Sequence, residues 1–161
     1  MEPIIGGAKR MERKTLLKKI ECAYIPVTDV AASVAWYEKV LGLRLRSPVQ
    51  PGGGAIMIMD SGQWLFLLPS RGGHPLNFVT TGWTEDRSPF EMFPICFETD
   101  NIQELDASLK EAGVWTEREI RDEGSCGLQL NFKDPDGNKF QVWQQPAAAK
   151  KPYVPAEQML L

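Results

Sequence analysis

The fold is decided by residues 22–42, which read CAYIPVTDVAASVAWYEKVLG. At the start of this stretch every second residue is apolar, the pattern of a half-buried strand: Ala23, Ile25 and Val27. Asp29 stands at a favourable helix N-cap position, and apolar residues then recur on one helix face: Val30, Val34, Tyr37 and Leu41. Gly42 is the residue type that commonly ends a helix. The stretch therefore predicts a strand over 20–28 and a helix that ends at Gly42.

Three further strands are predicted in the first half of the chain. Residues 43–46 alternate between apolar and charged side chains, which again indicates a strand. Turn residues at 51–54 and 60–62 separate the other two candidates, which are short apolar runs: 56–59 and 64–68. The first half thus predicts the order β-α-β-β-β.

The second half of the chain repeats this order. A strand is predicted over 94–99, and a helix follows with Asp100 or Asn101 as its N-cap. Gly113 ends this helix, and its buried stripe consists of Ile102, Leu105 and Leu109. The last three strands are expected over 115–120, 127–132 and 139–143, with a strong turn at 134–138 before the last of them.

The two halves correspond at a nearly constant offset. Cys22 corresponds to Pro94, 72 residues later, and Gly62 corresponds to Gly137, 75 residues later. An internal repeat of this kind predicts two similar modules that share one core. The expected division of the chain is a basic extension over 1–18, a domain over 19–145 with modules 19–70 and 91–145 and a connection over 71–90, and a tail over 146–161.

Two motifs resemble the glyoxalase/bleomycin-resistance/dioxygenase superfamily, also called vicinal oxygen chelate proteins. The first motif comprises Tyr24–Asp29 and Trp36–Leu43, and the second is Asp134–Phe140. The resemblance covers roughly residues 19–145. It implies an α+β fold in which two βαβββ modules form a paired, half-open, mixed β-sheet cleft with the helices outside.

The same resemblance bears on metal binding, because the superfamily includes both metal enzymes and metal-free drug-binding proteins. The metal enzymes take ligands, typically His or Glu, from four strand positions, which fall in this chain on Cys22, Phe66, Pro94 and Gln141. Two of these residues have no donor side chain, Gln141 is a weak neutral ligand, and one thiolate does not make a site. The single histidine, His74, lies in the connection. We therefore expect no metal and no other cofactor.

Strand alternation predicts which side chains face the cleft. They are mainly aromatic and neutral polar: Cys22, Tyr24, Trp64, Phe66, Cys96, Gln129, Asn131, Gln141 and Trp143. Such a set suits an organic ligand held by stacking and hydrogen bonds, or aromatics that fill a collapsed cleft or a dimer interface. Arg44 and Arg46 face either the cleft or solvent. Glu98 is a weak candidate for a general base, and no catalytic residue is assigned.

Composition excludes several classes of partner. The net charge of -3 and the pI near 5.3 argue against nucleic-acid binding. No apolar run approaches the ~20 residues of a membrane span, and Met1–Gly7 lacks the apolar core of a signal peptide. The three cysteines form no close-spaced pair, which favours a reducing compartment. The expectation is a cytoplasmic protein with no nucleic-acid or membrane partner.

Three functions are compatible with these features. The first is metal-independent binding of a small aromatic or apolar organic molecule by a homodimer that resembles bleomycin-resistance proteins. The second is an enzyme, either a glyoxalase-like lyase or isomerase or a dioxygenase-type enzyme. The third is a protein-interaction module with a filled cleft. The sequence leaves open whether the chain is an enzyme.

Overall fold

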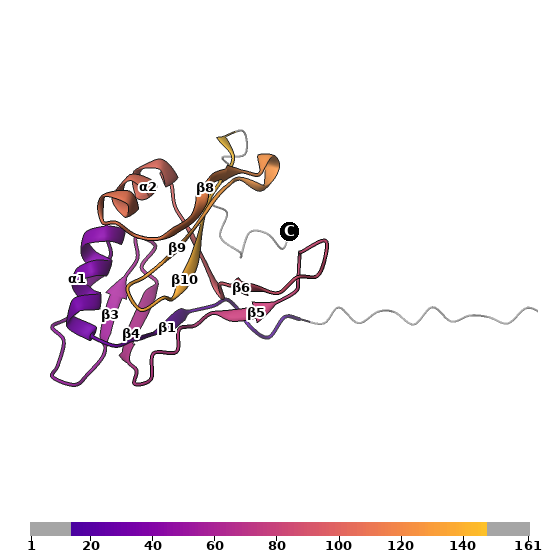
Figure 1. Cartoon of the computed structure of the whole chain (residues 1–161). Coiled ribbons are helices and arrows are strands. Elements are labelled where there is room, and N and C mark those ends of the chain that lie inside the picture. Colours follow the sequence, from indigo (N-terminus) through magenta and orange to yellow (C-terminus); the bar gives the residue numbers. More distant parts are fainter. Residues whose placement is uncertain (1–13, 148–161) are drawn as a thin grey trace, which may run out of the picture.

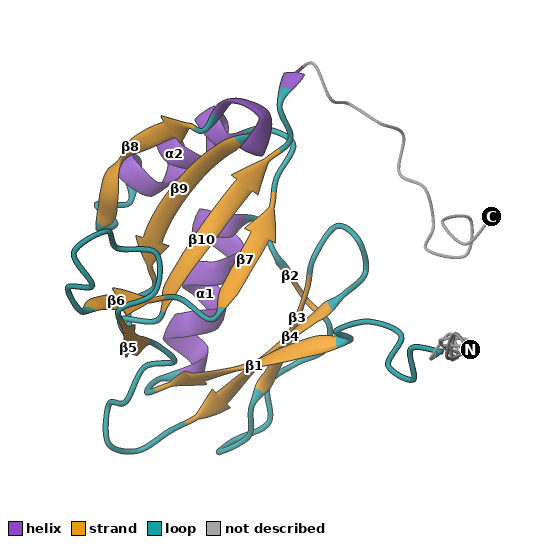
Figure 2. Cartoon of the chain, turned by 90° about the vertical axis from the view of Figure 1, so that its right-hand side faces the viewer, coloured by secondary structure: helices purple, strands orange, loops and turns teal. Residues whose placement is uncertain are grey.

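The computed structural model describes residues 14–147 and contains two four-stranded sheets and two α-helices (Figure 1). The predictions for residues 1–13 of the basic extension and for 148–161 of the tail lie outside the described residues. The two helices contact each other and lie together on one side of the sheets (Figure 2). In the described part of the chain, no helix has the length and apolarity that crossing a membrane requires.

The first module has the predicted element order and forms a mixed sheet. Its elements are β1 (Cys22–Val27), α1 (Val30–Leu41), β2 (Arg44–Leu45), β3 (Ala55–Ile58) and β4 (Trp64–Pro69). The strands lie in the order β1-β4-β3-β2, with β1 parallel to β4 and the other neighbours antiparallel. The sequence prediction of this module is confirmed to within about two residues at most element ends.

The second module repeats the arrangement. Its elements are β7 (Ile95–Glu98), α2 (Ile102–Glu111), β8 (Thr116–Asp122), β9 (Leu128–Lys133) and β10 (Lys139–Gln144), with a short 3-10 turn over Gly124–Cys126. The order β7-β10-β9-β8, with β7 parallel to β10, matches the first sheet position by position. The predicted α+β fold of two βαβββ modules is therefore confirmed.

The helix ends follow the capping rules that the sequence indicated. The Asp29 carboxylate accepts a hydrogen bond from the backbone N–H of Ala32 at 2.9 Å, and α1 ends at Gly42, whose φ is 70°. For α2 the N-cap is Asn101, whose side chain accepts from the N–H of Glu104 at 3.1 Å. These caps fix where each helix begins over its sheet.

The core lies between the helices and the sheets. Alternate residues of the strands point toward the helices and are fully buried: Ile25, Val27, Leu65, Leu67, Leu130, Phe132, Phe140 and Val142. Tyr37 of α1 and Leu109 of α2 are buried in the same cluster. The intervening strand residues therefore point to the opposite, helix-free face of each sheet.

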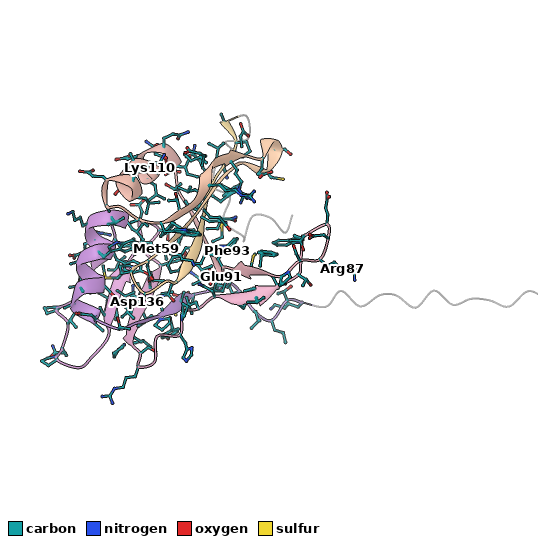
Figure 3. All side chains as sticks on the ribbon, in the orientation of Figure 1. Met59, Arg87, Glu91, Phe93, Lys110 and Asp136 are labelled. Atoms are coloured by element: carbon teal, nitrogen blue, oxygen red, sulfur yellow. The ribbon has the colours of Figure 1, made fainter. Side chains whose placement is uncertain are left out.

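The turn 134–138 joins the two modules. Asp134 is buried and accepts a hydrogen bond from the Tyr37 hydroxyl at 2.7 Å, and Asn138 donates to the carbonyl of Pro26 at 2.9 Å. Asp136, labelled in Figure 3, accepts from the N–H and the hydroxyl of Thr28. Burial raises the pKa of Asp134 above its ordinary value. The motif that carried the resemblance thus acts as a buried polar joint between the modules.

The connection 71–90 contains a strand that sequence analysis missed. Strand β5 (Phe78–Thr80) pairs with β6 (Phe90–Met92) in a two-stranded hairpin. Asn77 fixes it to the second module, because its side chain accepts from the N–H of Lys139 at 2.7 Å and donates to the carbonyl of Gly137 at 2.8 Å. Strands of three residues are too short to show an alternating pattern.

Candidate functional site

The predicted cleft residues lie on the helix-free faces of two different sheets. The first-module face consists of paired residues in two rows: Cys22, Trp64, Ile58 and Arg44 in one, and Tyr24, Phe66, Ile56 and Arg46 in the other. The second-module face carries Cys96, Gln129, Asn131, Gln141 and Trp143. Among residues 14–147, the hydrogen bonds and ring contacts of each set stay within their own module or reach the hairpin.

The first-module face presents an aromatic shelf formed by Tyr24, Trp64 and Phe66. The rings of Tyr24 and Phe66 are stacked, with centroids 4.7 Å apart and planes 15° apart. Trp64 meets Phe66 edge to face at 5.9 Å. Tyr24 is 57% exposed, so part of the stacked surface is open. The neighbouring Cys22 side chain raises the pKa of Tyr24 above its ordinary value.

The arginines whose direction the sequence left open both belong to the first-module face. Arg44 pairs with Ile58, and the N–H of Arg46 bonds to the carbonyl of Ile56. The guanidinium of Arg46 lies over the ring of Trp64, 4.4 Å from its centroid. Such a contact is a cation–π interaction, and it places a positive charge at the edge of the shelf.

The second-module face is polar, and its side chains bind one another. The Gln141 amide accepts from the Cys96 thiol at 3.3 Å and donates to Gln129 at 3.3 Å. Asn131 is 5% exposed and donates to Glu117 at 2.7 Å, while its own oxygen has no partner in the described residues. Apart from that oxygen, the amides of this face bind neighbouring side chains.

Trp143 is held by a tight contact with a glycine. Its ring N–H donates to the carbonyl of Cys126 at 2.6 Å. A Cβ on Gly127 would lie 2.6 Å from the Trp143 ring nitrogen, and Gly127 has a φ of 86°. This contact fixes the indole against the β8–β9 connection and explains why a glycine is required there.

A charged network around Lys139, which alternation places on the second-module face, includes three residues that the sequence did not indicate: Glu91, Glu117 and Lys133. Lys139 is only 3% exposed. Its ammonium group lies 3.2 Å from the Glu117 carboxylate and donates a hydrogen bond to the carbonyl of Glu91 at 2.7 Å. Glu91, labelled in Figure 3, also pairs with Lys133 at 2.7 Å. Burial alone would raise the pKa of Glu117, but hydrogen bonds from Asn131 and Lys139 outweigh it and lower that pKa. The signal for this network is the contact of Lys139 with Glu91 of the hairpin, and the hairpin was not predicted from the sequence.

The candidate base Glu98 lies in an open position. It is exposed at the end of β7, opposite Trp143 in the strand pairing. The Glu98 carboxylate is therefore open to solvent rather than enclosed in a site. All three cysteines of the chain are free thiols.

The four metal-ligand positions of the metal enzymes do not form a donor set in this structure. Phe66 is stacked on Tyr24, and Pro94 is exposed just before β7. Cys22 and Gln141 lie on different sheets, and the Gln141 amide is engaged by its neighbours. Within residues 14–147, no three His, Cys, Asp or Glu side chains are grouped so that they could hold a metal ion. These residues do not fit the metal of the enzymes.

Two hollows occur in the described part of the chain, and neither is lined by a residue of the aromatic shelf. The larger has a volume of about 330 Å³ and opens between Trp36 and Trp115 at the ends of the second-module strands. The smaller, of about 10 Å³, lies between Pro26 and the residues around His74. Because Tyr24 is 57% exposed, the shelf is an open surface in a single chain.

Most of the chain matches the model of one known protein family. The model of the Glyoxalase/Bleomycin resistance protein/Dioxygenase superfamily matches residues 19–142. The chain belongs to this superfamily. No curated protein is similar enough in sequence to count as a match.

Solved structures of the superfamily share the fold at low sequence identity. A glyoxylase/bleomycin resistance protein/dioxygenase domain from Frankia sp. is 18% identical, with a TM-score of 0.61 over 81% of this chain and 94% of that one. The fosfomycin resistance protein FosX from Listeria monocytogenes is 12% identical, with a TM-score of 0.60 over 83% and 98%. TnmS3, an antibiotic binding protein from a Streptomyces species, is 21% identical, with a TM-score of 0.58 over 83% and 100%. Identities this low show the fold alone.

Proposed function

We propose that this superfamily member binds a small aromatic organic molecule without a metal, with the aromatic shelf as the floor of its inter-module cleft. The observation that carries the proposal is the stacked, partly exposed pair of Tyr24 and Phe66. Rings that are already stacked offer a rigid surface, so little side-chain entropy is lost when a further ring stacks on them.

The rest of the protein supports binding rather than metal chemistry. The metal-ligand positions hold residues that do not fit a metal, and the candidate base Glu98 is exposed. One structural neighbour, TnmS3, is an antibiotic binding protein, which is compatible with a binding role on this fold. The face opposite the shelf would come from the second module, where the buried Asn131 oxygen has no partner in the described residues and would accept a hydrogen bond from a bound molecule.

The proposal includes a homodimer in the cytoplasm. A second copy would cover the shelf, which is open in one chain, and a reducing compartment would keep the three cysteines as thiols. Light scattering on the full chain should then give twice its mass of 18.1 kDa. A monomer at micromolar concentration would remove this part of the proposal.

The test is a ligand-observed NMR screen of planar aromatic and aliphatic compounds against the full chain. Aromatic compounds should bind, and a chelator should not change their affinity. Phe66→Ala should weaken binding, whereas Trp83→Ala, which removes a 92% exposed ring from the connection between β5 and β6, should not. Binding that requires a divalent metal, or metal-dependent turnover of hemithioacetals or catechols, would show an enzyme instead.

A further inference from the structure

The first-module face changes character from one edge of the sheet to the other. Its rings belong to β1 and β4 and its aliphatic residues to β3, while Arg44 lies on β2 and Arg46 directly after it. Arg46 lies over Trp64, and Trp64 contacts Phe66, so the ring surface continues without a break up to the guanidinium. A molecule that lies flat on the shelf would therefore meet a positive charge at its rim.

Neither arginine has an acidic partner in residues 14–147. Both are exposed, and none of the salt bridges of this part of the chain includes them. The other residues of the face are neutral. The cations of the second-module face differ, because Lys139 pairs with Glu117 and Arg121 pairs with Glu123. The first-module face thus carries positive charge that the described protein does not balance.

We propose that the ligand of the shelf is a planar aromatic carboxylate, with its ring on Tyr24 and Phe66 and its carboxylate at Arg46 and Arg44. The inference rests on the proposed function and names the chemistry of its ligand. A guanidinium matches a carboxylate with two parallel hydrogen bonds, and its stacking on Trp64 holds the planar fork in place. Because the chain carries a net charge of -3, attraction of an anion must come from these local charges.

Three probes that share a naphthalene ring and carry a negative, a neutral or a positive substituent test this assignment: naphthalene-2-carboxylate, 2-naphthamide and 2-naphthylmethylammonium. Each is titrated into ¹⁵N-labelled full-length protein, and amide shifts give both the affinity and the location of binding. The carboxylate should bind about tenfold more tightly than the amide, and the ammonium compound should bind most weakly. Added salt should weaken the carboxylate and leave the amide unchanged. The shifts should concentrate on β1, β2 and β4.

Arginine variants separate charge recognition from stacking. Arg46→Gln and Arg44→Gln should each reduce the preference for the carboxylate over the amide severalfold and leave the affinity for 2-naphthamide unchanged. The matched control is Arg71→Gln, an exposed arginine of the connection, which should keep the full preference.

The outcomes distinguish this inference from the proposed function. If carboxylate and amide bind equally, and Phe66→Ala weakens both, the aromatic binding site stands and the carboxylate assignment is wrong. If none of the three probes binds, both are wrong. If Arg46→Gln converts a dimer to a monomer while the carboxylate preference persists, the arginine serves contact between copies, which also overturns the assignment.

Discussion

The helix-free faces of the two sheets occupy equivalent positions in the repeat but have opposite chemistry. The first-module face stacks Tyr24 on Phe66 and ends at arginines that no described acid neutralises. The second-module face joins Gln141, Asn131 and Lys139 to neighbouring side chains and to the hairpin. One backbone arrangement therefore supports one face that is open to a partner and one that is largely satisfied by its own contacts.

This difference predicts different consequences of mutation. A buried polar group that loses its hydrogen-bond partner lowers the free energy of unfolding. Substitutions on the second-module face should therefore reduce folding stability. An exposed ring contributes less to the fold, so changes on the first-module face should reduce ligand binding instead. If substitutions on the two faces reduced stability and ligand binding to the same extent, the two faces would not differ in role.

The largest effect is expected from Lys139→Met. The ammonium is buried, and its loss removes the cation beside Glu117, which keeps only its hydrogen bond from Asn131, and the donor to the Glu91 carbonyl. Because the Glu117 side chain is 40% exposed, we expect a loss of about 2–3 kcal/mol of unfolding free energy, at the lower end for a broken buried pair. Urea denaturation at neutral pH measures it.

Lys133→Met is the matched control for that variant. Lys133 also pairs with Glu91, but its side chain is 30% exposed, and the pair should contribute less than about 1 kcal/mol. Equal losses in the two variants would mean that the burial of Lys139 does not matter, and that the second-module face is not held by its network.

The second effect is expected from Phe66→Ala and concerns the ligand. Removal of the central ring of the shelf should weaken binding of a planar aromatic probe by about tenfold, the usual loss for one stacked ring. The unfolding free energy should fall by only about 1–2 kcal/mol, because Phe66 is half-buried rather than in the core. Isothermal titration and urea denaturation on the same samples separate the two losses. An unchanged affinity would exclude the shelf as the binding surface.

The fold was predictable from sequence because its periodic elements are local. The helix after Asp29 and the strands of residues 22–27 and 139–144 bury the apolar residues that the spacing indicated. The hairpin over 78–92 was not predictable, because its short strands are stabilised by distant contacts such as that between Asn77 and Lys139. Local patterns do not contain such pairings.

The candidate site was predictable only in part. Alternation indicated correctly that Tyr24 and Phe66 share a face, and that Gln141 and Cys96 share another. It could not show whether a neutral amide is free or engaged, as in the bond between Gln141 and Gln129, nor that Lys139 is buried beneath the hairpin. Whether the predicted residues line one binding cleft stays a prediction.

A third effect concerns pH, and the two polar sites should respond in opposite directions. The pKa of Glu117 is lower in the folded protein than its ordinary value of 4.5. Glu117 therefore stabilises the fold above pH 4.5, and this stabilisation is lost as the pH falls through the pKa in the folded protein. Burial raises the pKa of Asp134 in the folded protein above its ordinary value of 3.8. Its contribution to the free energy of unfolding is therefore fully present below pH 3.8 and declines as the pH rises through the pKa in the folded protein.

Denaturation of three proteins between acidic and neutral pH tests these signs. The stability advantage of the wild type over Glu117→Gln should grow as the pH rises, whereas its advantage over Asp134→Asn should shrink. Parallel pH profiles for the two variants would contradict the difference that the burial of Asp134 and the hydrogen bonds of Glu117 predict.

The smallest effect is expected from Arg46→Gln on folding stability. The guanidinium contacts the Trp64 ring but is exposed, and an exposed cation–π contact contributes about 0.5–1 kcal/mol at most. The same substitution removes the repulsion between the positive charges of Arg46 and Arg44, which partly offsets the loss of the contact. We therefore expect the free energy of unfolding, measured by urea denaturation, to change by less than about 0.5 kcal/mol. A loss as large as that of Lys139→Met would mean that Arg46 is a structural residue, and the first-module face would then resemble the second in being built to hold itself together.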